Sequence, residues 1–289
     1  MISVIIPTYN RSAMLLKAIR SIQIQKNSDV EIIVIDDNSS DDTENIVSKL
    51  ADVTYIKNSS NKGPGYSRNL GYRLSKGEYI VFMDDDDYYI DDTFYQNAVH
   101  ILEQNPTVGF VAGFAKYEYT NGIIKEHPLN LSGYTGGTAY LKNFHFNWNK
   151  PDSTFTSVFR KTVLEAADFC NLQMMNDACI YMNALLYGDA YIINDYIGIY
   201  RIHDTNISKS IGCSFIIDNL KEKEKVFFKM NSTPNSWWFK QFKFTFVYYV
   251  VTNPPKDEIK NLIRWGIKHH HRSYKLIIYL LYRYCKVFK

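Results

Sequence analysis

The 289-residue sequence lacks several features that mark common classes of protein. It has four cysteines (Cys170, Cys179, Cys213 and Cys285) and no CxxC pair, so neither a disulfide scaffold nor a cysteine-ligated zinc module is expected. We expect reduced thiols, as in the cytoplasm. No apolar run reaches the roughly 18 residues that a spanning helix needs. Met1 leads directly into an expected strand, with no signal peptide before it, so the sequence predicts a cytoplasmic location.

Glycine-rich phosphate-binding loops are also missing. An NAD-dependent oxidoreductase would carry GxGxxG after its first strand. A sugar nucleotidyltransferase would be expected to carry a glycine-rich loop with a basic residue near the N-terminus. Here the first expected strand is followed by Pro7-Thr8-Tyr9-Asn10. This loop excludes the first class and argues against the second, which is kept as an alternative.

Acidic residues are absent from the end of the chain, after Glu258. Residues 211–289 hold 15 Lys and Arg against 5 Asp and Glu, a net charge of +10. Residues 1–210 hold 18 against 25, a net charge of −7. This asymmetry predicts a basic module joined to an acidic domain.

Four short apolar stretches in the first ninety residues have the composition of buried strands, and each precedes a polar loop and a helical stretch. The stretches are Ile2–Ile6, Val30–Ile35, Val53–Ile56 and Tyr79–Met83, and the expected helices span residues 12–25, 42–50, 64–74 and 92–103. The first strand is expected to end at Pro7. This alternation predicts an α/β fold with a mostly parallel sheet flanked by helices. The four loops should then meet at the carboxyl edge, where open α/β sheets bind ligands.

The most informative loop contains four consecutive carboxylates, Asp84-Asp85-Asp86-Asp87. In an extended strand alternate side chains share a face, so Asp84 and Asp86 would reach one ion while Asp85 points away. Oxygen ligands suit Mg²⁺ or Mn²⁺, and such ions usually hold a phosphate as well. An acidic turn that faces water is the alternative.

The second half of the acidic domain is less regular. Val108–Tyr119 predicts a strand, and Asn121-Gly122 after it is a hairpin signal. Residues 129–149 show no clear period and are predicted to form a loop. A strand is expected at 154–159, a helix from Lys161, and another helix at 178–187.

Taken together, these residues resemble a family 2 inverting glycosyltransferase of the GT-A fold. The matching segments are Pro7-Thr8-Tyr9-Asn10, Asp36-Asp37-Asn38-Ser39, Gly65-Tyr66-Ser67-Arg68-Asn69, Gly77-Glu78-Tyr79, the DxD element in residues 84–87, Asn176-Asp177 and Tyr200-Arg201-Ile202-His203. The sequence departs from the family pattern at Asn176, where the family usually has glutamate. The resemblance implies a Rossmann-like catalytic domain over residues 1–210, with a nucleotide-binding half (1–105) and an acceptor half (106–210). Residues 211–289 would form a helical C-terminal extension.

The resemblance also implies an activity and a set of site residues. The expected reaction transfers a sugar from a nucleotide-sugar, expected to be a UDP-sugar, to a hydroxyl of a glycan acceptor in bacterial surface-polysaccharide synthesis. The acceptor is expected to be lipid-linked. The implied residues are Asp177 as catalytic base, Thr8, Tyr9, Asp37, Arg68 and Asp84 at the nucleotide, and Asp84, Asp86 and His203 at a Mn²⁺ or Mg²⁺ ion. Each role has a structural alternative, such as helix capping for Thr8 or a favourable helix-dipole position for Asp177.

The basic C-terminal region allows two interpretations. Lys260, Arg264, Lys268 and Arg272 recur every four residues and would form a basic stripe opposite an apolar one. Such a helix can lie on an anionic membrane surface, here the inner face of the plasma membrane, or it can pack its apolar side on protein. A homodimer is a further possible use of this aromatic region. No nucleic-acid partner is expected, because no binding module is recognisable.

Two other function classes have partial support in the sequence. Asn261-Leu262-Ile263-Arg264-Trp265 is similar to the QxxRW element of processive synthases, but its first residue differs and no spanning helix accompanies it, so a nonprocessive enzyme is expected. A membrane-associated carbohydrate-binding protein without catalysis is the nonenzyme alternative.

Overall fold

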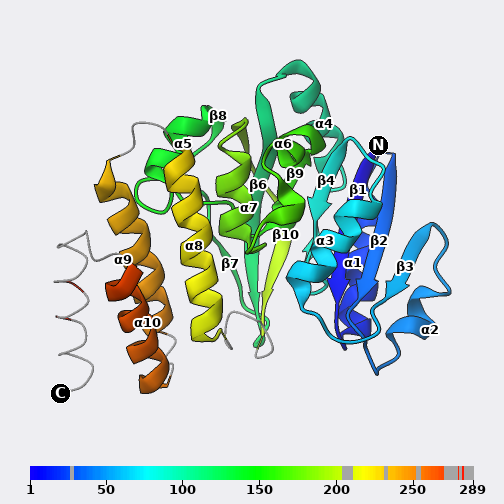
Figure 1. Ribbon diagram of the computed structural model, residues 1–289. Helices are drawn as coiled ribbons and strands as arrows, with labels where there is room; N and C mark the ends of the chain where they lie inside the picture. The colour runs from blue at the N-terminus through cyan, green and yellow to red at the C-terminus, as the bar shows by residue number, and fades with distance from the viewer. Residues whose placement is uncertain are drawn as a thin grey trace. The chain divides into compact units, whose positions relative to one another are not determined.

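The computed structural model describes residues 1–26, 29–203, 211–230, 234–251 and 255–269, together with Tyr279 and Tyr282. The chain divides into two compact units, Met1–His203 and Asp204–Lys289 (Figure 1). The first unit contains all the described strands and most of the helices, and the second unit contains three long helices.

A ten-stranded sheet forms the centre of the first unit, in the order β3-β2-β1-β4-β9-β6-β10-β5, with β7 beside β6 and β8 beside β10. The strands are β1 (Ile2–Thr8), β2 (Val30–Asp36), β3 (Val53–Lys57), β4 (Tyr79–Phe82), β5 (Tyr88–Tyr89), β6 (Val108–Tyr119), β7 (Ile124–Glu126), β8 (Gly133–Thr135), β9 (Ser157–Arg160) and β10 (Asp189–Ile202). Strands β1 to β4 are parallel to one another, and β9 pairs antiparallel with both β4 and β6. The predicted α/β fold is confirmed, with a sheet that is parallel in its first half and mixed in its second.

Helices cover both faces of the sheet. Those of the first unit are α1 (Ser12–Gln23), α2 (Thr43–Val47), α3 (Pro64–Leu74), α4 (Phe94–Gln104), α5 (Gly137–Asn143), α6 (Lys161–Ala166) and α7 (Asp177–Ala184), with 3-10 turns η1 (Thr154–Thr156) and η2 (Phe169–Asn171). Successive strand side chains point to opposite faces. Accordingly Val4 and Ile6 join one core cluster with α1 and α4, whereas Ile5 faces α3. Both faces of β1 are therefore buried, as its continuous apolar composition predicts.

The close approach of α3 to β1 depends on Gly71. A Cβ atom at this position would collide with the side chain of Ile5. The helix that begins at Pro64 therefore lies directly against the strand, and this contact fixes where Arg68 leaves the helix.

Strand β1 continues one residue past Pro7, to Thr8, and this corrects the predicted strand end. Pro7 pairs in register with Ile35 of β2. The carbonyl of Ile5 accepts a hydrogen bond from Met83 N, so the backbone polar groups of Ile5 face β4. Alternate residues of a strand turn these groups to the same side, so the nitrogen of Pro7 also faces β4. The β1–β4 ladder ends at Ile5, so the missing N–H of Pro7 costs no ladder hydrogen bond.

Three other local predictions were wrong. Residues 84–87 form a turn after β4 rather than an extended strand, with Asp87 N donating to Asp84 O at 3.3 Å, and contacts with Arg11 and Arg201 hold this turn. Residues 129–149 contain β8 and α5. The predicted strand at 154–159 begins as the 3-10 turn η1 and becomes extended only at Ser157.

The second unit consists of α8 (Cys213–Lys229), α9 (Asn235–Val251) and α10 (Lys256–His269). Glu258 accepts hydrogen bonds from Cys213 N at 2.8 Å and from the Tyr249 hydroxyl at 2.5 Å, so this carboxylate joins all three helices. Phe242 of α9 stacks on Trp265 of α10 with ring centroids 6.4 Å apart. Within the described ranges, no helix is both long and apolar enough to cross a membrane. The predicted basic position Arg272 and the thiol of Cys285 lie outside the described residues.

Candidate active site

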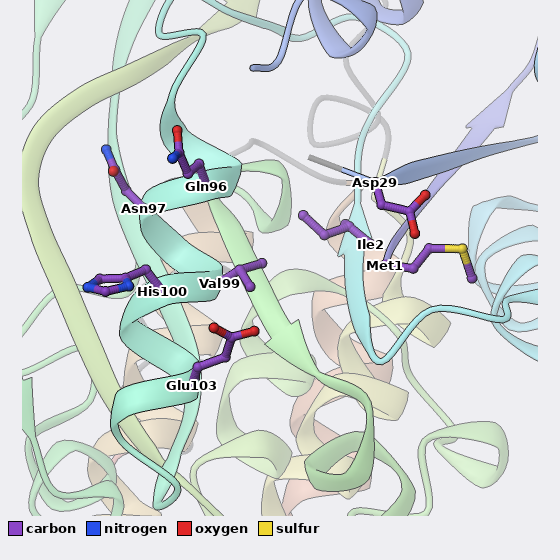
Figure 2. Close-up of a pocket in the computed structure, with 8 residues that line it drawn as sticks. All are labelled: Met1, Ile2, Asp29, Gln96, Asn97, Val99, His100 and Glu103. Atoms are coloured by element: carbon purple, nitrogen blue, oxygen red, sulfur yellow. The ribbon is translucent and has the colours of Figure 1, made fainter. Parts of the chain in front are cut away.

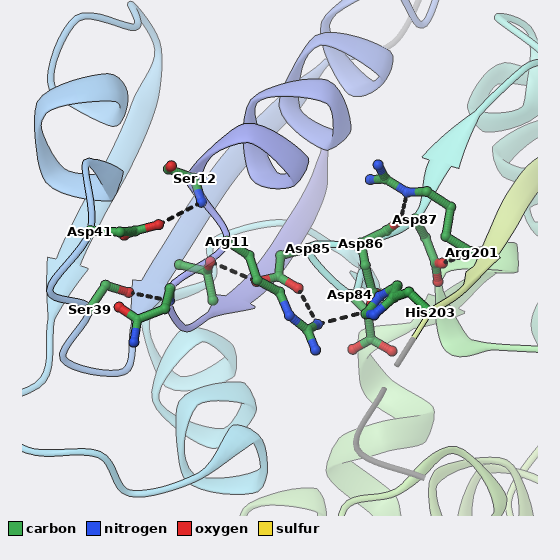
Figure 3. Close-up of polar contacts among 12 residues, drawn as sticks. Arg11, Ser12, Ser39, Asp41, Asp84, Asp85, Asp86, Asp87, Arg201 and His203 are labelled. Atoms are coloured by element: carbon green, nitrogen blue, oxygen red, sulfur yellow. Dashed lines mark hydrogen bonds and ion pairs between the residues drawn. The ribbon is translucent and has the colours of Figure 1, made fainter. Parts of the chain in front are cut away.

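The carboxyl ends of β1, β2 and β4 bring three of the predicted loops together, as Figure 3 shows. The loops after β1 and β2 are tied by two hydrogen bonds, from Asn10 N to Ser39 Oγ at 2.9 Å and from Ser40 N to Asn10 Oδ1 at 2.8 Å. Asp41 accepts from Ser12 N at 3.0 Å and so connects the β2 loop with the first turn of α1. The backbone of this edge is therefore held independently of any ligand.

Asp84, Asp86 and Asp87 each offer a carboxylate oxygen, and these three atoms lie within 4.8 Å of one another. Asp85 points away from this carboxylate group, as predicted, although the cause is the turn geometry rather than strand alternation. Asp87 was not among the predicted ligands. Its membership follows from the turn, which brings the fourth aspartate back beside the first.

Asp85 anchors the carboxylate run to β1. It accepts a hydrogen bond from Thr8 Oγ1 at 2.7 Å and an ion-paired one from Arg11 at 3.0 Å. Burial raises the pKa of Asp85 to about 6, with the charge of Asp86 acting in the same direction and Arg11 opposing it. Thr8, predicted at the nucleotide, is itself buried in this contact.

Asp86 is held by two cationic or potentially cationic side chains. Its Oδ2 lies 2.8 Å from Arg11 and 2.8 Å from His203 Nε2 (Figure 3). Burial raises the pKa of Asp86, and the neighbouring Asp84 raises it further. The structure thus brings the predicted residue His203 to the carboxylate group, in contact with Asp86.

Asp87 is completely buried, yet only one of its oxygens has a hydrogen-bond partner. Its Oδ1 accepts from the backbone N–H of Arg201 at 3.2 Å, while Oδ2 has no hydrogen-bond partner. Arg201 also donates from Nε to the carbonyl of Asp86. Burial raises the pKa of Asp87 well above its ordinary value, together with the charges of Asp86 and Asp84. A buried carboxylate oxygen without a donor is costly unless a cation satisfies it.

Arg68 connects the carboxylate group with Asp177. The guanidinium donates to Asp84 at 2.5 Å and to the carbonyl of Met175 at 2.9 Å, and it lies 4.0 Å from Asp177. Burial alone would lower the pKa of Arg68, but Asp84 and Asp177 raise it, so the side chain stays charged. Arg68 is buried, so it is not an ordinary solvated surface charge of the helix.

Asp177 is the first residue of α7, and Asn176 is its N-cap, accepting from Cys179 N at 3.0 Å. The asparagine therefore caps the helix that begins with Asp177. Lys150 lies 3.7 Å from the other oxygen of Asp177. Burial raises the pKa of Asp177, while the charges of Lys150 and Arg68 oppose the rise. A carboxylate with a raised pKa beside two cations is suited to accept a proton near neutral pH.

Asp37 organises the loop between β3 and α3. Its carboxylate accepts from Asn58 at 2.9 Å, from Lys62 N at 2.8 Å and from Gly63 N at 2.7 Å. Asp37 is buried, whereas Tyr9, also predicted at the nucleotide, is 47% exposed at the opening of the same edge. The structure thus assembles Thr8, Asp37, Arg68, Asp84, Asp86, Asp177 and His203 around one edge of the sheet.

Sequence reasoning missed Arg11, Lys150 and the ligand position of Asp87. Arg11 directly follows Pro7-Thr8-Tyr9-Asn10, so its place next to a predicted site loop could have identified it. Lys150 lies in a segment without periodicity, and no sequence pattern connects it with a helix that begins 27 residues later. Only the tertiary contact identifies it.

The residues present fit a divalent cation. The donors are carboxylate oxygens, which hard cations prefer, and one of them is the unsatisfied Oδ2 of Asp87. The excess of carboxylates over nearby cations at this turn also favours an added positive charge.

Two cavities lie apart from the carboxylate group. One, of about 450 Å³, lies between the start of β1 and α4, at the opposite edge of the sheet, and is lined by residues such as Met1, His100 and Glu103 (Figure 2). The other, of about 310 Å³, is lined by residues that include Lys150, whose Nζ lies 3.7 Å from Asp177. The smaller cavity is thus linked to Asp177 through one side chain.

Comparison with known proteins gives consistent results. The model of the family described as "Glycosyl transferase family 2" matches residues 3–167. The chain is 36% identical over 212 residues to the GalNAc(5)-diNAcBac-PP-undecaprenol beta-1,3-glucosyltransferase of Campylobacter jejuni, which covers 70% of this chain and 64% of that protein. It is 37% identical over 105 residues to the UDP-Glc:alpha-D-GlcNAc-diphosphoundecaprenol beta-1,3-glucosyltransferase WfaP of Escherichia coli, covering 36% and 41% of the two chains. The matched part of the chain thus spans less than two thirds of either relative.

Solved structures share the fold. Residues 1–349 of TarS from S. aureus, in complex with UDP-GlcNAc, superpose with a TM-score of 0.63 at 20% identity, covering 76% of this chain and 65% of that one. The mannosyltransferase PcManGT from Pyrobaculum calidifontis, in complex with GDP-Man and Mn²⁺, gives a TM-score of 0.57 at 15% identity. This match covers 100% of this chain and 80% of that one. At these identities the likeness establishes the architecture alone.

Proposed function

We propose, because the chain belongs to glycosyltransferase family 2, that it is a nonprocessive inverting enzyme that transfers a sugar from a UDP-sugar to a hydroxyl of a glycan acceptor. The single observation that carries this proposal is the chain of contacts from the carboxylate group through Arg68 to Asp177. A leaving-group site and a base are thereby held in one rigid arrangement. A carbohydrate-binding protein without catalysis would not require it.

Asp177 acts as the general base. Its carboxylate accepts the proton of the acceptor hydroxyl while that oxygen attacks the anomeric carbon. Attack by one oxygen opposite to the leaving diphosphate inverts the configuration, so an α-linked donor gives a β-linked product. Lys150 and Arg68 keep Asp177 ionised and fix its position.

The other side chains bind and orient the donor. Thr8, Asp37 and Arg68 are assigned to the uridine side, with Tyr9 against the base and Asp84 near the ribose. Asp37 carries out this role through the loop that it holds by three hydrogen bonds. Fixing the donor in this way places the anomeric carbon within reach of the acceptor oxygen.

Asp84, Asp86 and Asp87 would hold a Mn²⁺ or Mg²⁺ ion, with His203 beside Asp86 as a further contact. When bound, such an ion neutralises the charge that develops on the departing diphosphate. A structure of a relative in fold contains Mn²⁺, which supports the assignment of a divalent metal.

The acceptor is proposed to be a lipid-linked glycan of bacterial surface-polysaccharide synthesis. Two relatives are named for transfer of glucose to undecaprenol-linked acceptors that contain N-acetylated amino sugars. Glucose is therefore the first donor sugar to test. The assay measures UDP release from UDP-glucose with and without a synthetic GlcNAc-diphosphoundecaprenol analogue. Failure to release UDP from any nucleotide-sugar, with all divalent metals tried, would reject the proposal.

The second unit is proposed to hold the enzyme at an anionic membrane surface, the inner face of the plasma membrane. Ile259 and Ile263 of α10 are buried, while Arg264 and Lys268 are exposed. Phe228 and Val251 are 72% and 77% exposed, which adds apolar surface. Sedimentation with phosphatidylglycerol vesicles tests this, with an Arg264→Glu/Lys268→Glu variant expected to pellet less than wild type. A homodimer also remains a prediction, to be measured by light scattering.

A further inference from the structure

The smaller cavity, of about 310 Å³, is lined by Tyr117 of β6 and by residues of the loops that follow β7 and α5. Asn149, Lys150 and Asp152 complete the lining. Its volume is at the lower end of the roughly 300–1,000 Å³ range of small-molecule sites. We propose that this cavity binds one pyranose ring of the acceptor glycan. The inference rests on the proposed function and assigns the position of the sugar that receives the transfer.

The lining includes aromatic rings, Tyr117 and His127, beside a fixed carboxylate, Asp152. The Tyr117 hydroxyl donates to Asp152 at 2.6 Å, and the other oxygen of Asp152 accepts from Ala115 N at 3.2 Å. The His127 ring lies edge-on to Tyr117, with centroids 4.3 Å apart. Sugar rings present apolar C–H faces and polar hydroxyls, so a site with aromatic surface and a few positioned acceptors matches them.

Another part of the lining, at Asn149, is fixed by hydrogen bonds to its backbone. Asn149 N donates to Asn130 Oδ1 at 2.9 Å, and Asn149 O accepts from the Tyr140 hydroxyl at 2.6 Å. These bonds hold the chain on both sides of the Asn149 side chain, which can both donate to and accept from a hydroxyl. Because the wall is held before a ligand binds, less conformational entropy is lost on binding.

Lys150 connects the cavity with the base. It lines the cavity, and its Nζ lies 3.7 Å from Asp177. One side chain, Lys150, therefore contacts both the cavity and the carboxylate proposed to accept the proton. The link through Lys150 distinguishes this cavity from the one shown in Figure 2, which lies at the other edge of the sheet.

The charges favour a sugar hydroxyl over a phosphate. Lys150 Nζ already donates to the carbonyls of Pro151 and Asp152, at 2.8 and 2.7 Å. The carboxylate of Asp152 would repel an anion, whereas it accepts readily from hydroxyl donors.

Saturation-transfer NMR with the full chain and saturating UDP tests the proposal. The probes are methyl α-D-glucopyranoside and methyl N-acetyl-α-D-glucosaminide, and the variants are His127→Ala and Asn149→Ala. Each variant should bind the preferred probe about fivefold to tenfold more weakly, as expected for one lost hydrogen bond or ring contact. The matched control is His100→Ala, which lines the cavity of Figure 2 and should bind like wild type.

The outcomes separate this inference from the proposed function. Saturation of either probe in wild type, weakened in both variants, supports the cavity and identifies which sugar it takes. Equal saturation in wild type and both variants, or none in a wild-type protein that binds UDP by calorimetry, overturns it. If the wild-type protein does not bind UDP at all, that result counts against the proposed function and not against the cavity, because the carboxylate group does not line the cavity.

Discussion

Arg68 of α3 and Asp84 after β4 lie 16 residues apart, and their side chains meet at 2.5 Å. The same guanidinium nitrogen lies 4.0 Å from Asp177, more than a hundred residues further along the chain. One buried cation thus joins the two halves of the first unit. It also sets the spacing between the carboxylate group and the base.

The Arg68–Asp84 pair should be energetically coupled. Arg68→Met removes a buried charge-assisted hydrogen bond and should lower the free energy of unfolding by about 2–3 kcal/mol. In a double-mutant cycle with Asp84→Asn, urea unfolding should give a coupling energy of about 0.5–3 kcal/mol. Arg73→Met, on the exposed side of the same helix, is the control and should change stability little. Strict additivity of the two site variants would contradict the coupling.

Replacing the base should affect turnover and leave donor binding intact. Asp177→Asn is expected to reduce kcat about 10²–10⁴-fold, because general base catalysis contributes that much. UDP affinity measured by calorimetry should stay near the wild-type value. Glu103→Gln, at the cavity of Figure 2, serves as the matched carboxylate control. If the Asp177→Asn variant had the same kcat as this control, the base would have to be another residue.

The pH dependence of kcat/KM should report on Lys150. Burial raises the pKa of Asp177, and the positive charge of Lys150 opposes this rise. The base works when deprotonated, so activity is lost as the pH falls through this pKa. Lys150→Met should raise the pKa further and move the acidic limb to higher pH, whereas Lys150→Arg should leave it close to wild type. An unchanged limb in Lys150→Met would mean that Lys150 has no electrostatic effect on the base.

Metal affinity should depend on Asp87 as well as on the predicted ligands. The buried Oδ2 of Asp87 has no hydrogen-bond donor, and Asp87→Asn would replace one carboxylate of the group by a neutral amide. Mn²⁺ binding followed by electron paramagnetic resonance should weaken by about tenfold or more. Asp42→Asn, an exposed aspartate on another loop, should bind Mn²⁺ like wild type.

Arg11 should act in the opposite direction. Its guanidinium pairs with Asp85 and Asp86 and supplies positive charge to the carboxylate run. Arg11→Gln removes that competing charge, so the affinity for Mn²⁺ in the absence of nucleotide should rise. Weaker Mn²⁺ binding in Arg11→Gln would show instead that Arg11 is needed to hold Asp86 in position. Arg20→Gln, which lies in the last turn of α1, provides the control.

The sequence by itself determined the parallel half of the sheet and the edge at which the site lies. Buried strands such as β1 have continuous β-branched composition, and polar loops at successive strand ends meet at one edge whatever the details of packing. The resemblance to family 2 implied Thr8, Asp37, Arg68 and Asp84 together, and the structure brings them to the same edge. The resemblance also implied Asp177 and His203, which lie at this edge as well.

Only the tertiary structure decided which charges meet. The turn that brings Asp87 beside Asp84 is held by contacts with Arg201 and Arg11, and neither contact is visible in a strand pattern. Lys150 reaches Asp177, and a cavity forms beside it, because segments without periodicity fold over the second half of the sheet. Such contacts join residues far apart in the chain, so they depend on packing rather than on local propensity.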